Sequence, residues 1–374
     1  MKKYLRAFSK SILKIIGITL LSIIGIFLIG VIIVAINSPG RLDPLKDNNG
    51  TKIAGSLTEK NWIEIGGIRQ GYFIRSENQE NPVILFLHGG PGSPSLPFHI
   101  PREVSERLEK YFTVVYWEQR GAGISFNRSI DPATMTVEQM IEDTRQMTEY
   151  LQRRFNQEKI YLMGNSWETF LGVKTIEKHP ENYLAYIGIA QVTNQVESER
   201  LAYDFMLKHA MKIGDRRAVR NLQKFDKNAP EFPCLTYIEI SRSLMNRYGI
   251  GMTHTERLNN FRMGRKILFF RGYTFSEKLN YIRGMSFSIE HLWDNVIDVN
   301  LFESSTSFQV PIFIIHGKWD YQVSYTLARE WLEKIEAPEK GFFSFENSAH
   351  MPNMDEPENF VQVVRNIVLK ISGD

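Results

Sequence analysis

The chain has 374 residues, of which 43% are hydrophobic and 23% charged, with a net charge of +3. That length fits one large domain or two ordinary ones, and the composition is that of a globular protein with a hydrophobic core. The small net charge and the lack of a Lys/Arg-rich stripe with interleaved aromatics exclude nucleic acid as an expected partner. The single cysteine, Cys234, excludes an internal disulfide and a cysteine-based metal cluster, and we expect it to be a small buried apolar residue.

The N-terminal region contains an apolar run from residue 15 to 36, which has no charged residue and only Thr19 and Ser22 as hydroxyls. As a helix this run is about 33 Å long, enough to cross a hydrocarbon core of roughly 30 Å. Five basic residues and no acidic one come before it: Lys2, Lys3, Arg6, Lys10 and Lys14. The positive-inside rule then predicts that residues 1–14 are cytoplasmic and that everything after residue 37 lies outside the cell membrane.

A cleaved signal peptide is the competing interpretation of this run. Its apolar region is expected to span roughly 7–15 residues and to end in a small-x-small cleavage site. The run here is longer, and Ala35-Ile36-Asn37 is a poor cleavage site. The sequence therefore predicts a retained single-pass anchor whose residues 15–36 contact membrane lipid.

After the anchor, residues 37–58 are rich in Gly, Pro, Asp and Asn, which is typical of a linker. Residues 62–65 and 68–74 flank Gly66-Gly67 and predict an antiparallel hairpin. Short apolar segments then alternate with a helical pattern over Val137–Phe155, which indicates a parallel sheet. The predicted strands are Val83–Leu87, Thr113–Trp117, Lys159–Met163, Leu184–Ile189, Val310–Ile315 and Gly341–Phe345.

Residues 193–305 interrupt this alternation with amphipathic helical stretches and many aromatics, but no clear parallel strand. We interpret them as a helical cap inserted into an α/β core that comprises residues 59–192 and 306–374. The predicted fold class is therefore α/β, with a mostly parallel sheet, helices on both faces, a cap and an N-terminal transmembrane helix.

Three segments that could carry chemistry each follow a predicted strand, where ligands collect in an open parallel sheet. They contain Ser166 in Gly-Asn-Ser-Trp-Glu-Thr, Asp320 in His-Gly-Lys-Trp-Asp, and His350 in Glu-Asn-Ser-Ala-His. The order Ser, Asp, His along the chain is that of one fold of hydrolases. We assign Ser166 as nucleophile, His350 as the base that removes its proton, and Asp320 as the residue that orients the imidazole.

A glycine-rich segment, His88-Gly-Gly-Pro-Gly92, follows the strand Val83–Leu87. The backbone N–H groups of Gly90 and Trp167 are the predicted oxyanion hole. A phosphate-binding loop is disfavoured because Pro91 is present and neither a following Lys-Ser/Thr nor a GxGxxG pattern occurs. No His/Glu spacing of a zinc site appears either, so we predict no metal and no cofactor.

Three motifs carry a resemblance to a known family: the segment His88–Gly92, the segment Trp117-Glu-Gln-Arg-Gly-Ala-Gly123, and Gly164-Asn-Ser-Trp167. Together they resemble the proline iminopeptidase (prolyl aminopeptidase) family of α/β-hydrolase serine peptidases, over roughly residues 60 to 370. The resemblance implies a capped α/β-hydrolase fold and the removal of an N-terminal residue, usually proline, from a small peptide substrate. The family's nucleophile, acid and base match Ser166, Asp320 and His350.

The sequence departs from that family in two places. Position 168, a glycine in the family's Gly-x-Ser-x-Gly motif, is Glu168 here, and we expect its carboxylate to shift the turn or point outward. A negative charge there would suit the helix dipole but oppose the charge that develops in the oxyanion hole. The family also holds the substrate amine with acidic cap residues, and the sequence does not choose among the candidates Glu197, Glu199, Asp204, Glu231, Glu239 and Glu290.

Two alternatives to an aminopeptidase remain open at the sequence level. One is an esterase or amidase for other small substrates, because this fold hosts many chemistries. The other is a non-catalytic ligand-binding protein, whose nucleophile turn has degenerated at Glu168.

Overall fold

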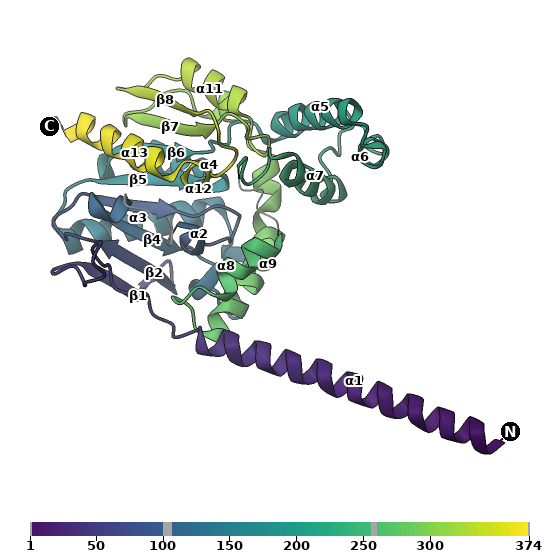
Figure 1. Cartoon of the computed structure of the whole chain (residues 1–374). Helices are drawn as coiled ribbons and strands as arrows, with labels where there is room; N and C mark the ends of the chain where they lie inside the picture. The colour runs from purple at the N-terminus through teal and green to yellow at the C-terminus, as the bar shows by residue number, and fades with distance from the viewer. Residues whose placement is uncertain (1, 100–106, 256–259, 373–374) are drawn as a thin grey trace.

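The computed structural model describes residues 2–99, 107–255 and 260–372. Its centre is an eight-stranded sheet in the order β1-β2-β4-β3-β5-β6-β7-β8 (Figure 1). The strands are β1 (Leu57–Ile65), β2 (Ile68–Ser76), β3 (Val83–Leu87), β4 (Thr113–Glu118), β5 (Ile160–Asn165), β6 (Tyr183–Ile189), β7 (Ile312–Gly317) and β8 (Lys340–Phe345).

The predicted α/β class is confirmed, with its hairpin and its parallel strands. Strand β1 pairs antiparallel with β2, and β2 with β4, whereas every pairing from β4 through β3 to β8 is parallel. The six predicted parallel strands are all present, within two residues at each end. Strands β5 and β7 run two residues further than expected, so Asn165 and Gly317 still belong to the sheet.

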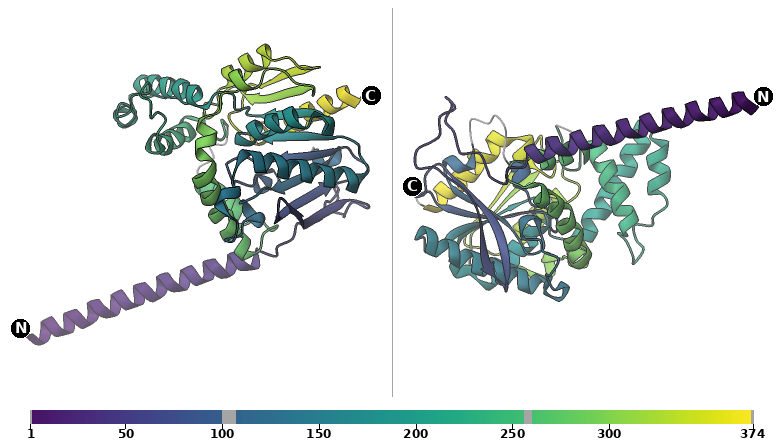
Figure 2. Two further views of the ribbon diagram at one scale, coloured as in Figure 1. Left: turned by 180° about the vertical axis from the view of Figure 1, so that it is seen from behind. Right: turned by 90° about the horizontal axis from the view of Figure 1, so that it is seen from below.

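Helices cover both faces of the sheet. Successive side chains of each strand point to opposite faces, so both faces carry apolar side chains that the helices bury. On β3, Leu85 and Leu87 join the core under α3 (Val137–Phe155), α4 (Trp167–Lys178) and α11 (Tyr325–Lys334). Its Ile84 and Phe86 join the opposite core under α2 (Leu96–His99) and α13 (Pro357–Ser372). The two views of Figure 2 show the helical layers on either side of the strands.

Helix α3 occupies the predicted range, and its start and end are set by local chemistry. The Thr136 side chain accepts from the N–H of Gln139, and Asn156 ends the helix in the left-handed region. Short elements complete the core: α12 (Pro352–Asp355) and 3₁₀ turns at Leu108–Lys110, Gly123–Ser125, Pro132–Thr134 and Pro180–Asn182.

Between β6 and β7 the chain forms six helices and no strand in the described residues. They are α5 (Gln195–Ile213), α6 (Arg216–Leu222), α7 (Leu235–Tyr248), α8 (Asn260–Leu268), α9 (Phe275–Ile297) and α10 (Leu301–Ser304). Helices α5, α6 and α7 form a lobe that projects from the sheet, and α9 runs beside the core (Figure 1). The lobe has its own apolar core, which includes Met206, Tyr237 and Met245. Cys234, expected to be buried, is only half-buried there because it precedes the first turn of α7.

Helix α1 (Lys2–Ile36) extends away from the rest of the molecule (Figure 1). Its part from Lys14 to Ile36 has a mean hydropathy of 3.0 and is long and apolar enough to cross a membrane. In the segment that follows, Leu45 is buried, and β1 begins at Leu57.

Candidate active site

Ser166 lies on a sharp turn between β5 and α4. Its φ of +58° is in the left-handed region, which a residue with a Cβ rarely adopts and which clusters at functional sites. Close approach of helix and strand at this turn requires Gly164, where an added Cβ would lie 2.8 Å from the carbonyl oxygen of Glu168. The turn therefore has the strained strand-to-helix geometry of a nucleophile elbow.

Asp320 and His350, which are 30 positions apart in the sequence, are hydrogen-bonded in the structure. The distance from His350 Nδ1 to Asp320 Oδ2 is 2.8 Å. Asp320 follows β7 and His350 follows β8, so both lie at the same edge of the sheet as Ser166. No hydrogen bond joins the Ser166 hydroxyl to His350 among the described residues. The structure thus brings the predicted acid and base together and places the predicted nucleophile at the same strand ends.

The surroundings of Asp320 keep its carboxylate charged. Burial alone would raise the pKa of Asp320, but the charge of His350 and hydrogen bonds from His316 and His350 outweigh burial and hold the pKa well below its usual range. The N–H groups of Gln322 and Val323 donate to the other carboxylate oxygen, at 2.9 and 3.1 Å.

His316 has a role in the site that the sequence analysis missed. Its Nε2 lies 3.3 Å from Asp320 Oδ2, and its side chain is fully buried. His316 lies near the end of β7, four residues before Asp320 in the sequence. That spacing could have drawn attention to His316, but spacing alone does not assign the residue a function.

The predicted oxyanion hole lies against the elbow. An added Cβ at Gly89 would be 3.3 Å from Ser166 Cβ, so the glycine-rich loop packs directly on the serine. Gly90 has a φ of +139°, which requires glycine. Within the described residues, the N–H groups of Gly90 and Trp167 donate to no backbone carbonyl, which leaves both available to a ligand oxygen.

Glu168 differs from the expectation that its side chain points outward. It is fully buried, and the nearest charged-type neighbour is His88, whose Nδ1 lies 3.8 Å from Glu168 Oε1. Neither carboxyl oxygen of Glu168 has a hydrogen-bond partner among the described residues. Burial raises the pKa of Glu168 well above its usual range, and its own backbone N–H offsets this only in part. Burial without a hydrogen-bond partner therefore favours the neutral form of this carboxyl.

His88, the first residue of the glycine-rich segment, is neutral as well. Burial lowers the pKa of His88 to about 4, against hydrogen bonds that its ring donates to backbone carbonyls and that act the other way. Its Nε2 accepts from the N–H of Gln119 at 3.2 Å, so Nδ1 carries the proton and donates to the carbonyl oxygen of Gly89 at 3.0 Å. The contact between His88 and Glu168 is thus one between a neutral imidazole and a carboxyl whose burial favours the neutral form.

The motif from Trp117 to Gly123 is structural in this chain. The guanidinium of Arg120 is buried and binds both carboxylate oxygens of Asp143, at 2.8 and 3.1 Å. Glu118 accepts from the hydroxyl of Tyr273 at 2.5 Å and from the N–H of Ile124 at 2.6 Å. These bonds fix the loop after β4 to α3 and to the cap, next to the glycine-rich loop.

Cap residues 250–252 are bonded to both catalytic loops through the main chain. The carbonyl of Ile250 accepts from Tyr321 N–H at 3.1 Å, and that of Gly251 accepts from His350 N–H at 3.1 Å. The carbonyl of Met252 accepts from Met351 N–H at 3.0 Å. The cap therefore takes part in placing the acid and the base.

Of the six acidic cap candidates, three form ion pairs and the other three are exposed. Glu199 is fully buried and is paired with Arg242 at 2.5 Å, while Glu197 and Asp204 pair with Arg200 and Lys227. Glu231, Glu239 and Glu290 are exposed. None of the six is both buried and unpaired, so the structure singles out no carboxylate for a substrate amine. Among the described residues, no group of three His, Cys, Asp or Glu side chains could hold a metal ion.

Comparisons with known proteins agree with this geometry. A family model described as alpha/beta hydrolase fold matches residues 82–357. The chain is 33% identical over 306 residues to the probable aminopeptidase YbaC of Bacillus subtilis, covering 81% of this chain and 93% of that protein. It is 22% identical over 309 residues to a proline iminopeptidase of Lactobacillus helveticus, covering 80% of this chain and 94% of that protein. The solved proline iminopeptidase of Mycobacterium smegmatis superposes with a TM-score of 0.58 at 14% identity, over 84% of this chain and 100% of that one.

Proposed function

Because this chain belongs to the α/β-hydrolase family and is an aminopeptidase-like member of it, we propose that it is a membrane-anchored serine aminopeptidase of the proline iminopeptidase type. The observation that carries the proposal is the pairing of Asp320 with His350 at 2.8 Å, at the strand ends where Ser166 occupies a strained elbow. A neutral or solvated aspartate would not serve, and the described contacts keep this one charged and buried.

The proposed mechanism gives each of these residues a role. His350 removes the proton of Ser166 as the hydroxyl attacks the carbonyl carbon of the N-terminal residue, whose bond to the next residue's nitrogen then breaks. Asp320 holds the imidazole through Nδ1 and stabilises its charged form. The N–H groups of Gly90 and Trp167 donate to the oxyanion of the tetrahedral intermediate. His350 then protonates the leaving amine, and water hydrolyses the acyl-enzyme by the same route.

The substrate class rests on the relatives, whose names are aminopeptidase and proline iminopeptidase. The esterase or amidase alternative stays open for a specific reason. An aminopeptidase must bind a free amine, and none of the six cap candidates is both buried and unpaired.

A substrate panel on the full chain tests the reaction class. Proline 4-nitroanilide is compared with the alanine and leucine anilides and with 4-nitrophenyl butyrate, and labelling by a fluorophosphonate probe is measured in parallel. We expect labelling of the wild type but not of Ser166→Ala, together with turnover of an aminoacyl anilide. Turnover of the ester alone would favour the alternative enzyme, and absence of labelling with absence of turnover would favour the non-catalytic ligand-binding protein.

The anchor is the second part of the proposal. It rests on the apolar segment Lys14–Ile36 and on the basic residues before it. We expect the protein to stay with membranes through a high-salt wash, and protease added to intact cells to digest the domain after residue 40. A domain that is protected in intact cells and digested only after lysis would reverse the orientation.

A further inference from the structure

The point where the chain leaves the proposed anchor is fixed to the cap. The ammonium of Lys278, on α9, donates to Asn37 O at 3.1 Å, to Ser38 Oγ at 2.8 Å and to Leu268 O at 2.6 Å. Pro39 forms a β-bridge with Thr274, and Arg41 N–H donates to Arg271 O at 3.1 Å. Whatever the direction of α1, the cap residues 268–278 are held beside the end of the apolar segment.

Exposed apolar side chains gather around this point. Outside α1, the described residues include ten large apolar side chains classed as exposed, and six of them lie between residues 261 and 282. Phe275, Leu279 and Ile282 follow the i, i+4, i+7 spacing of one helix face and are 39%, 40% and 57% exposed. The others are Phe261, Leu268 and Phe269. A concentrated exposed apolar surface of this kind marks an interaction site.

The same segment is strongly basic. From residue 261 to residue 283 the sequence holds a single acid, Glu277, which is paired with Lys60 at 2.6 Å. Six basic residues occur there: Arg262, Arg265, Lys266, Arg271, Lys278 and Arg283. Lys278 is buried and its ammonium binds the residues after α1, so the other five carry the positive charge of the surface. The net charge of the whole chain is only +3, so positive charge is concentrated here.

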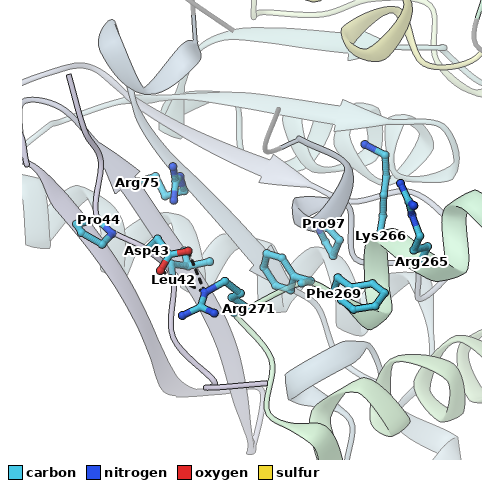
Figure 3. A pocket seen from close by; sticks show the side chains of 11 residues that line it. Leu42, Asp43, Pro44, Arg75, Pro97, Arg265, Lys266, Phe269 and Arg271 are labelled. Carbon is cyan, nitrogen blue, oxygen red and sulfur yellow. Dashed lines mark hydrogen bonds and ion pairs between the residues drawn. The ribbon is translucent and has the colours of Figure 1, made fainter. Parts of the chain in front are cut away.

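A pocket of about 650 Å³ opens within this surface (Figure 3). Its lining combines apolar groups from Leu42, Pro97 and Phe269 with the cationic side chains of Arg265 and Lys266. Its one acid, Asp43, is paired with Arg271 at 3.0 Å. Apolar walls together with cationic side chains suit an anionic amphiphile.

We propose that the segment 261–283, called here the basal surface, rests on an anionic lipid bilayer and that its pocket takes the headgroup of an anionic phospholipid. The proposal rests on the membrane anchoring proposed above, since the anchor brings the basal surface to the bilayer. Basic residues interleaved with Phe, Leu and Ile are typical of segments that lie in the bilayer interface.

A second copy of the chain is a poorer occupant of the basal surface. A twofold dimer would place the same patch against itself, so the basic residues of one protomer would face those of the other. Like charges opposed across an interface are unfavourable. An anionic bilayer offers an apolar interior to the exposed Phe, Leu and Ile side chains and negative charge to the basic residues.

The test uses the full chain in vesicles with a dye at single positions. In a Cys234→Ser background, Phe261→Cys and Ile282→Cys carry an environment-sensitive dye, and Leu235→Cys serves as a control. Leu235 is also apolar and is 61% exposed, but it lies on α7 in the projecting lobe. Spin-labelled lipid should quench the dye at 261 and 282 several-fold more than at 235 in phosphatidylglycerol vesicles, and less so in phosphatidylcholine vesicles.

A charge-reversal pair separates docking from simple proximity. Arg265→Glu with Arg283→Glu should bring quenching at 261 and 282 down to the level at 235, whereas Arg216→Glu with Arg220→Glu on α6 should change nothing. Flotation of each variant with vesicles after a salt wash reports the anchor independently. A chain that floats but shows equal quenching at all three sites overturns the docking proposal alone, and a chain that does not float overturns the anchor and docking together. Quenching replaced by energy transfer between protomers at 282 would instead show a dimer interface, and would also overturn the proposal.

Discussion

Two buried carboxyl groups belong to the region around Ser166, the proposed nucleophile, and their surroundings differ. Asp320, after β7, receives two backbone N–H groups and faces the imidazoles of His350 and His316. Glu168, in the first turn of α4, has no hydrogen-bond partner for either oxygen among the described residues and faces a neutral histidine. The pKa of Asp320 is held below its usual range and that of Glu168 is raised well above it.

The difference teaches that burial does not by itself decide the charge of a group. Removing water favours the neutral acid at both positions, and only the donors around Asp320 reverse that preference. The carboxyl that is proposed to act in catalysis is thus the one with partners. At Glu168 the lack of such partners favours the neutral form.

The largest effect is expected at Ser166, the proposed nucleophile. Ser166→Ala should lower kcat for the best substrate of the panel by about 10⁴-fold or more, because the attacking oxygen is lost. Circular dichroism and the melting temperature should stay near wild type, since little packing changes. Activity close to wild type would mean that the nucleophile lies elsewhere, and the comparison of the two carboxyls would lose its meaning for catalysis.

Removing the charge at Asp320 should cost nearly as much. Asp320→Asn keeps the shape of the side chain but no longer stabilises the charged imidazole or fixes its tautomer, so kcat should fall by about 10³- to 10⁴-fold. The variant should also be less stable at neutral pH, since a depressed pKa in the folded state contributes stability above the unfolded value of about 3.9. That contribution is lost as pH falls through the folded-state pKa, so the stability gap should close in acid. Kinetics and urea unfolding at several pH values measure both effects, and a gap that widens in acid would contradict the assignment.

The pH dependence at Glu168 should have the opposite sign. Above about pH 4.3 the unfolded chain loses this proton while the folded chain keeps it, so folding stability falls as pH rises toward the folded-state pKa. Glu168→Gln removes this dependence. Its stability relative to wild type should therefore increase with pH, by up to about 1.4 kcal/mol per unit, when unfolding in urea is compared between pH 5 and pH 7. A difference that is independent of pH would show that Glu168 is ionised in the folded protein.

The smallest expected effect is that of Glu168→Gln on catalysis. A neutral acid and an amide differ little in charge, so kcat at neutral pH should stay within about threefold of wild type. Asp320→Asn is the matched control, because it makes the same carboxyl-to-amide change at the other site. A rise of tenfold or more in Glu168→Gln would restore the idea that a negative charge opposes the oxyanion there.

The main features of the site could be predicted because they depend on local patterns. Apolar runs followed by polar segments placed Ser166, Asp320 and His350 at strand ends, and helical spacing defined α3 to the residue. The parallel sheet then brings those strand ends to one edge.

The features that could not be predicted depend on contacts between distant segments. The orientation of Glu168 follows from the close packing of β5 on α4 at Gly164 and from the position of His88. The role of residues 250–252 comes from main-chain carbonyls, which leave no mark on residue type. The attachment of the segment after α1 depends on Lys278, more than 200 residues further along the chain.

The main-chain bonds of residues 250–252 have a consequence for how such enzymes can be recombined. A cap inserted between two strands is an obvious segment to exchange between related enzymes in order to alter substrate specificity. In this chain a swap with junctions at 193 and 305 would also replace the carbonyls that hold Tyr321, His350 and Met351. A chimera would inherit a displaced imidazole along with its new pocket unless the native Ile250-Gly251-Met252 segment were kept. Placing the junctions on either side of residues 250–252 would exchange the rest of the cap and keep these three hydrogen bonds.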